Sequence, residues 1–210
     1  MNFSASTVIA ITTIIISIMA FSNHSLMSKL ILNPYSVKKF NEWYRLFSCA
    51  LIHADWMHLI FNMLALWSFG RVVEYYYAVE FGGNGMIYFV LLYVGGQLFS
   101  VLPTYAKYKD FMAYNSLGAS GAVSAIVFAS ILFEPWNPIY LFFIPIGIPA
   151  VIFGVAFLAI SQYLSNRGGD NINHDAHFYG ALFGLLFTIV MKFSILLDFF
   201  QKLMTPTLHN

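Results

Sequence analysis

The chain contains little charge and little cysteine. Only 9% of its 210 residues are Asp, Glu, Lys or Arg, and 60% are hydrophobic, whereas soluble domains average about 25% charged and about 45–50% apolar residues. A water-facing globule of this size cannot bury so much apolar surface, which excludes a soluble enzyme, and a disordered tail is excluded as well. The net charge of +1 offers no basic surface for nucleic acid. The single cysteine, Cys49, excludes an internal disulfide.

The sequence also lacks ligand sets for a metal. It has no H-E-x-x-H motif, and no Glu or Cys completes a site with His53 and His58 or with His174 and His177. The segment 168–170, Gly-Gly-Asp, resembles part of an aspartyl-protease motif, but no second Asp lies within an apolar run to share a proton with it. We therefore expect neither a metal nor another cofactor.

Six apolar runs dominate what is present. A helix needs about 20 mostly apolar residues to cross a bilayer, and the runs lack the strict alternation of barrel strands. We expect an all-α, multi-pass membrane protein with one domain over residues 1–210. The predicted transmembrane helices lie at about 5–21, 57–74, 85–102, 118–133, 146–164 and 175–196.

The link between the first two runs, residues 22–56, is too long for a tight turn. It mixes aromatic residues such as Trp43 and Trp56 with basic residues such as Lys38 and Arg45. This mixture favours a segment that lies partly in the membrane interface over a solvated loop.

The distribution of Lys and Arg leaves the orientation open. With the N-terminus inside, the inner segments hold Arg71, Lys192 and Lys202, and the other seven of the ten cations lie outside. The positive-inside rule taken alone places the N-terminus outside.

Strongly polar residues inside a membrane span are costly, so each is a candidate functional residue. His58 and Asn62 are four residues apart and share one face of the second predicted helix. Both side chains can donate hydrogen bonds. Taken alone, the pair is better explained by interhelical hydrogen bonding, which membrane helices use routinely.

A serine and a histidine lie at the start of two other predicted helices. Ser120 follows Gly118 and Ala119, where the first N–H groups of a helix and the positive end of its dipole would favour a developing oxyanion. His177 precedes Gly180 and Gly184, a Gly-x-x-x-Gly strip on which another helix can pack closely. The two helices cross in the same direction, so their packing would bring hydroxyl and imidazole together for nucleophilic catalysis. Simple helix packing remains the alternative for each motif alone.

Taken together and in this order, these motifs resemble those of the rhomboid intramembrane serine proteases. The resemblance spans about Trp43 to Gly184. It rests on Trp43-Tyr44-Arg45, on His53 with His58 and Asn62, on Gly118-Ala119-Ser120-Gly121, and on Ala176-His177-Phe178-Tyr179-Gly180 with Gly184.

The resemblance implies a six-helix rhomboid-like bundle with a membrane-embedded first loop and a Ser–His dyad in a wet cavity. Ser120 would be the nucleophile and His177 the general base and acid. His58 and Asn62 would line the oxyanion hole, and Arg45 and Glu74 would be structural anchors. Residues 165–174 would form a flexible cap, and the fifth helix would border a lateral substrate entry. The other expected structural residues near the site are His53, Gly118, Gly121, Gly180 and Gly184.

The same resemblance implies transmembrane proteins as substrates, the lipid bilayer as surroundings and the bacterial cytoplasmic membrane as location. Asp175 is expected to cap or charge the start of the sixth helix rather than to complete a triad. Many members have an aromatic ring four residues after the nucleophile, whereas this chain has Ser124. A catalytically inactive client-binding protein is the alternative function. A small-solute transporter would show inverted repeats or paired broken helices, which we do not find.

Overall fold

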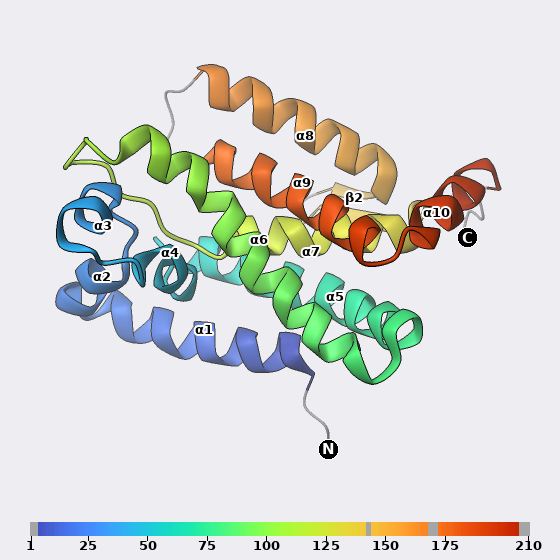
Figure 1. Cartoon of the computed structure of the whole chain (residues 1–210), viewed down its shortest axis with the longest axis horizontal. Coiled ribbons are helices and arrows are strands. Elements are labelled where there is room, and N and C mark those ends of the chain that lie inside the picture. The colour runs from blue at the N-terminus through green and yellow to red at the C-terminus, as the bar shows by residue number, and fades with distance from the viewer. Residues whose placement is uncertain (1–3, 142–143, 168–171, 206–210) are drawn as a thin grey trace.

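The computed structural model describes residues 4–141, 144–167 and 172–205. Figure 1 shows a helical bundle in which several short helices cluster at one end. The long helices are α1 (Ala5–Phe21), α5 (Trp56–Phe81), α6 (Gly85–Tyr108), α7 (Ser120–Phe133), α8 (Ala150–Arg167) and α9 (His174–Met191). The shorter elements are α2 (His24–Leu30), α3 (Pro34–Phe40), α4 (Arg45–Ser48), η1 (Cys49–Leu51), η2 (Gly82–Asn84), β1 (Pro138–Leu141), β2 (Ile144–Pro149) and α10 (Ser194–Met204).

Helix α7 lies at the centre of the bundle. Every residue from Gly121 to Phe133 is buried, and α7 contacts α5, α6, α8, α9 and α10. A helix that is apolar on all sides belongs in such an enclosed position.

Helix α1 has its small residues inside and its large apolar residues outside. The buried residues are Ser6, Ala10, Thr13, Ser17 and Ala20, spaced at helical intervals. The large exposed ones are Val8, Ile11, Ile15, Ile18 and Met19. Small residues let helices pack closely, and exposed branched apolar side chains suit lipid rather than water.

The six predicted helices are all present, but several boundaries were wrong. The second and third continue beyond residues 74 and 102, to Phe81 and Tyr108. Residues 146–149 belong to β2 rather than to a helix. Proline lacks a backbone N–H and forces the preceding residue into extended conformation, so Pro149 delays the helix to Ala150.

The sixth predicted helix also breaks before residue 196. Helix α9 ends at Met191, because Lys192 adopts an extended backbone (φ −155°, ψ 101°). Helix α10 then leaves at an angle of 112°.

By length and mean hydropathy, the described part of the chain contains one helical stretch able to cross a membrane, Trp56–Tyr108. The bent pair α9 and α10 would be a second if it is counted as one span. Helices α1 and α7 have 17 and 14 residues, fewer than the roughly 20 that span a bilayer. Six membrane crossings therefore remain a prediction.

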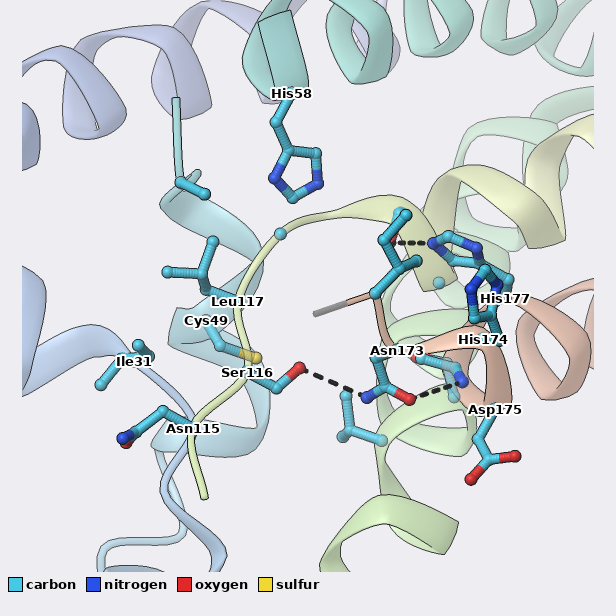
Figure 2. Close-up of a pocket in the computed structure, with 18 of the residues that line it drawn as sticks. Ile31, Cys49, His58, Asn115, Ser116, Leu117, Asn173, His174, Asp175 and His177 are labelled. Atoms are coloured by element: carbon cyan, nitrogen blue, oxygen red, sulfur yellow. Dashed lines mark hydrogen bonds between the residues drawn. The ribbon is translucent and has the colours of Figure 1, made fainter. Parts of the chain in front are cut away.

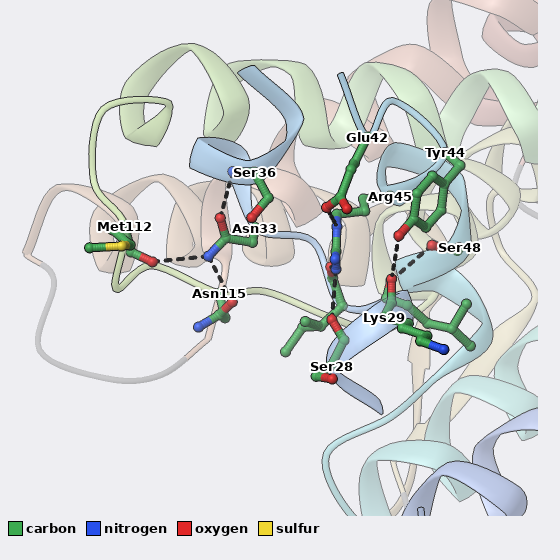
Figure 3. Close-up of polar contacts among 12 residues, drawn as sticks. Ser28, Lys29, Asn33, Ser36, Glu42, Tyr44, Arg45, Ser48, Met112 and Asn115 are labelled. Atoms are coloured by element: carbon green, nitrogen blue, oxygen red, sulfur yellow. Dashed lines mark hydrogen bonds and ion pairs between the residues drawn. The ribbon is translucent and has the colours of Figure 1, made fainter. Parts of the chain in front are cut away.

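The segment 22–56 folds into α2, α3, α4 and η1, and its centre is held by Arg45 (Figure 3). The guanidinium of Arg45 donates 2.8 Å hydrogen bonds to the carbonyls of Ser28 and Ile31 and contacts the Glu42 carboxylate at 2.6 Å. Asn33 joins the same segment to the loop before α7 by donating to the carbonyls of Met112 and Tyr114. The segment is a folded unit rather than an extended link.

Candidate active site

Ser120 and His177 meet where α7 and α9 begin. The Oγ atom of Ser120 lies 2.8 Å from Nε2 of His177. The glycine strip of α9 makes this possible, since a Cβ atom on Gly180 or Gly184 would collide with the α7 backbone at Gly121 or Ala125. The two helix backbones therefore lie in direct contact, which fixes the hydroxyl against the imidazole.

The start of α7 concentrates positive partial charge around Ser120. Ala119 is the N-cap and has no side-chain cap, and Ser120 is the first helical residue. The N–H groups of the first helical turn have no acceptor within the helix and point out of its N-terminus. Together with the helix dipole they stabilise an anion that forms beside Ser120.

Helix α5 supplies the opposite wall of the site. The ring of His58 packs against Gly118, where φ is +111° and a Cβ atom would lie 2.6 Å from Cε1 of His58. Only glycine satisfies both conditions. In Figure 2, His58 reaches down from the helix at the top of the view, and His177 lies to its right. Asn62 also lines the pocket, and one of its two amide hydrogens is donated to the His58 carbonyl at 2.9 Å.

His53 lies behind this wall and is completely buried. The Ala119 N–H points to its Nε2 at 3.5 Å, and its Nδ1 lies 3.0 Å from Oγ of Ser17. Because an N–H can only donate, Nε2 is the acceptor and Nδ1 carries the hydrogen. Ser17 then accepts from Nδ1 and donates to the Leu51 carbonyl. Burial in this network lowers the pKa of His53 to about 3, so the ring is neutral.

Asn173 is a site residue that sequence reasoning missed. Its side-chain oxygen accepts the Ala176 N–H at 3.1 Å and so caps α9. Its amide donates to Thr104 at 2.9 Å and to Ser116 at 3.3 Å, as Figure 2 shows for Ser116. An Asn directly before an apolar helical run is an N-cap signal and could have been recognised. It connects α6, the loop before α7 and the helix that carries His177.

Asp175 does not cap the helix, because Asn173 does. It accepts a short hydrogen bond from Ser165, at the end of α8, and lies 3.7 Å from the Lys107 ammonium. It therefore adds negative charge to the first turn of α9, which the helix dipole favours. The same contacts connect α8 to α9.

Arg45 and Glu74 lie away from the pocket. Arg45 organises the segment 22–56, as described above. Glu74 accepts hydrogen bonds of 2.9 Å from the backbone and the hydroxyl of Ser6, and so connects α5 to the start of α1. Both contacts stabilise the bundle rather than the reacting groups.

The pocket around Ser120 has a volume of about 970 Å³. His58, Asn62, Ser120 and His177 all line it. Of the expected cap at 165–174, residues 168–171 lie outside the described residues. Among the described residues, no three His, Cys, Asp or Glu side chains cluster as metal ligands would.

A serine bonded to a histidine at a helix N-terminus, faced by side chains able to donate hydrogen bonds, has the geometry that nucleophilic catalysis requires, and it lies within an apolar helical bundle. The sequence profile of the Rhomboid domain matches residues 40–193. The chain belongs to the rhomboid family, which is membrane-embedded.

Curated relatives agree with this assignment. The chain is 31% identical over 142 residues to Rhomboid protease GluP of Bacillus subtilis (strain 168), covering 68% of this chain and 25% of that protein. It is 27% identical to RHOMBOID-like protein 12, mitochondrial, of Arabidopsis thaliana, over 77% of this chain and 50% of that protein. It is also 27% identical to Putative rhomboid protease YdcA of Bacillus subtilis (strain 168), over 71% of this chain and 67% of that protein. The chain thus spans half or less of the length of the first two of these relatives.

Proposed function

We propose that this chain is an intramembrane serine endopeptidase that hydrolyses peptide bonds in or near the transmembrane segments of membrane proteins. The observation that carries the proposal is the 2.8 Å contact between Ser120 Oγ and His177 Nε2 at the N-terminus of α7. Membership of a family with relatives named as proteases supports it.

The proposed reaction uses the Ser120 hydroxyl, the His177 imidazole and one water molecule. With its hydrogen on Nδ1, the imidazole of His177 accepts the Ser120 proton through Nε2 as Oγ attacks the scissile carbonyl carbon. His177 then gives that proton to the leaving amine, and the C–N bond breaks to leave an acyl-enzyme. A water molecule that enters the pocket loses a proton to His177 and attacks the ester. The ester C–Oγ bond then breaks, the new carboxyl terminus leaves, and His177 returns the proton to Ser120.

Negative charge on the carbonyl oxygen is stabilised from two directions. The Ser120 N–H and the α7 dipole act from one side, and the side chains of His58 and Asn62 act from the other. Gly118 lets the His58 ring approach closely enough for this role. Gly121 lets α7 lie against Ser100 of α6, which fixes the start of the helix.

Six membrane crossings in one domain, with the segment 22–56 at the interface, complete the proposal. The exposed apolar surface of α1 supports it. We also propose the bacterial cytoplasmic membrane as location, although the family includes relatives named as mitochondrial and chloroplastic.

A fluorophosphonate probe tests the assignment directly. The purified wild type in detergent should be labelled, and Ser120→Ala and His177→Ala should not be. Ser124→Ala, one turn further along α7, is the matched control and should be labelled like the wild type. Cleavage of a single-span substrate should follow the same pattern. Labelling that persists in Ser120→Ala would show that the nucleophile lies elsewhere.

The same experiment separates the peptidase from a catalytically inactive client-binding protein. A folded wild type that neither takes up the probe nor cleaves, but retains a transmembrane peptide, would favour the binding protein. The presence of both Ser120 and His177 in contact favours the peptidase.

A further inference from the structure

Helix α10 follows α9 at 112°. The extended conformation of Lys192 makes the turn, and Figure 1 shows α10 crossing the end of the bundle rather than continuing along it. If α9 crosses the membrane, α10 lies close to the membrane plane. It packs against α7 and α9, and Lys202 reaches Phe133, the last residue of α7. Ser120 begins α7, so α10 lies at the opposite end from the candidate active site.

Three different faces run along α10. The inward face carries Ile195, which is 2% exposed, and Phe199, which packs on the core. An outward apolar stripe follows the i, i+4, i+7, i+11 spacing, with exposed fractions of 63%, 59%, 52% and 84% for Phe193, Leu197, Phe200 and Met204. Exposed polar residues form a separate stripe beside it: Ser194, Asp198 and Gln201.

Contacts with the rest of the bundle fix the orientation of α10 about its own axis. The Trp136 indole donates a 2.9 Å hydrogen bond to the Lys202 carbonyl, and the Lys202 ammonium donates a 2.9 Å bond to the Phe133 carbonyl. The same ammonium lies 5.6 Å from the centre of the Tyr76 ring. Because these contacts use the inward face, the apolar stripe is displayed outward and cannot turn into the core.

We propose that α10 is an in-plane interfacial helix whose apolar stripe enters the lipid at the membrane face opposite Ser120. Helix α9 also exposes apolar residues in its last turns, Leu186 and Val190. A helix with protein on one side, apolar residues on the second and polar residues on the third fits the boundary between headgroups and acyl chains.

The charges of α10 indicate which lipid it needs. Lys192 is paired with Glu80 at 2.7 Å, and Lys202 points inward. Asp198 adds a negative charge to the polar stripe. Within the described part of α10, no surplus of cations faces outward, so insertion depends on apolar contact and requires no anionic lipid.

Nitroxide labelling of single introduced cysteines tests the proposal independently of peptidase activity. Phe200→Cys and Gln201→Cys are adjacent positions on the apolar and the polar stripe, and both are exposed. The native Cys49 is buried, so the folded wild type should take up almost no label. A variant that has unfolded would be detected because Cys49 and the introduced cysteine would both be labelled. The full chain is placed in phosphatidylcholine vesicles, and collision of the label with oxygen and with a water-soluble nickel chelate is measured.

We expect the oxygen-to-nickel collision ratio at position 200 to exceed that at 201 several-fold. Leu197→Cys should behave like position 200, and Asp198→Cys like position 201. Equal, nickel-accessible labels at both positions would overturn the proposal, because the stripe would then lie in water. Shielding of position 200 from both reagents would overturn it as well, because a second copy or another protein segment would then cover the stripe.

Discussion

The ring of Phe157 lies 6.0 Å from the ring of His177, with the two planes inclined at 32°. Phe157 comes from α8 and also packs on Phe128 of α7 at 5.7 Å. The chain has Ser124 where many rhomboids have an aromatic ring four residues after the nucleophile. An aromatic contact with the histidine is therefore made by a different helix. Since α8 contacts α9 at Ser165–Asp175 and along this packing, the position of α8 affects how His177 is held.

Replacement of Phe157 by alanine should lower kcat with little change in KM. Aromatic pairs contribute about 0.5–1.5 kcal/mol beyond burial, so we expect a loss of about two- to tenfold in rate. Phe157→Tyr keeps the ring and should recover most of the loss. Leu158→Ala, the next residue on α8, is the control for a general effect on the helix. Equal losses in both alanine variants would mean that the ring contact has no special role.

Asn62 should contribute to the transition state more than to substrate binding. Removal of one oxyanion donor typically costs about 10²–10³ in rate. Asn62→Ala should therefore reduce kcat by this order, leave KM nearly unchanged and slow fluorophosphonate labelling in parallel. Asn62→Asp retains the shape but replaces the amide donor by a carboxylate, and should be at least as impaired. A variant with normal labelling and turnover would remove Asn62 from the oxyanion hole.

Arg45 should be required for the segment 22–56 to stay folded. Its loss leaves the Ser28 and Ile31 carbonyls without their donor and Glu42 without its partner. The Glu42 side chain is 31% exposed, so most of the expected cost comes from the two carbonyls, because a hydrogen bond to a charged group contributes about 1.5–3 kcal/mol. We expect Arg45→Ala to lower the thermal midpoint strongly and to expose residues 22–56 to protease. Arg71→Ala is the control, because Arg71 is exposed on α5 and stacks over Trp67. A midpoint for Arg45→Ala that matched this control would contradict the anchoring role.

Periodicity and hydropathy predicted the helices best where the run had clear ends. Helix α1 was predicted at its observed limits from an uninterrupted apolar run without charge, and the structure shows Ser4 as its N-cap. The end of α9 was missed because the apolar pattern continues through Phe193 and Leu197, while the break depends on the backbone of Lys192. Hydropathy measures burial or lipid contact and does not detect a change in direction.

The motifs identified Ser120 and His177, and the small residues of the two helices explained how they could meet. Contacts between distant segments could not be predicted in the same way. Asn173 is hydrogen-bonded to Thr104, 69 residues away. Phe157 on α8 lies near His177 on the neighbouring helix α9. A single sequence shows that such a residue is polar or aromatic. Which residue it contacts depends on how the helices pack against each other.

Acid should destabilise the fold through His53. The unfolded imidazole takes up a proton near its ordinary pKa of 6.5, whereas the folded one resists until about pH 3. The unfolded state thus binds more protons in this window, and the free energy of unfolding should fall as pH drops from 6.5 towards 3, by up to about 1.4 kcal/mol per unit. The groups facing His53 are Ser17, the Ala119 N–H and the ring of His58, 4.8 Å away, with Asp55 nearby.

His53→Gln should flatten this dependence, because glutamine retains an oxygen that can accept the Ala119 N–H but does not titrate. Chemical denaturation in detergent micelles between pH 4 and 7.5 measures the slope in each protein. The assignment fails if the glutamine variant keeps the slope of the wild type.

Asn173 combines two functions that substitution can separate. Asn173→Ser keeps an oxygen that can accept the Ala176 N–H, but its shorter side chain lacks the amide that donates to Thr104 and Ser116. Asn173→Ala loses the cap as well, and N-cap loss costs about 0.5–2 kcal/mol. We therefore expect Asn173→Ala to lower stability by about 1 kcal/mol relative to Asn173→Ser, while both lower kcat because the start of α9, and with it His177, is no longer fixed to α6 and to the loop before α7. Thr104→Val, which removes one of the two amide contacts and leaves the cap intact, should reduce kcat less than Asn173→Ser and should barely change the denaturation midpoint. Full activity in Asn173→Ser would show that the helix cap alone positions the histidine.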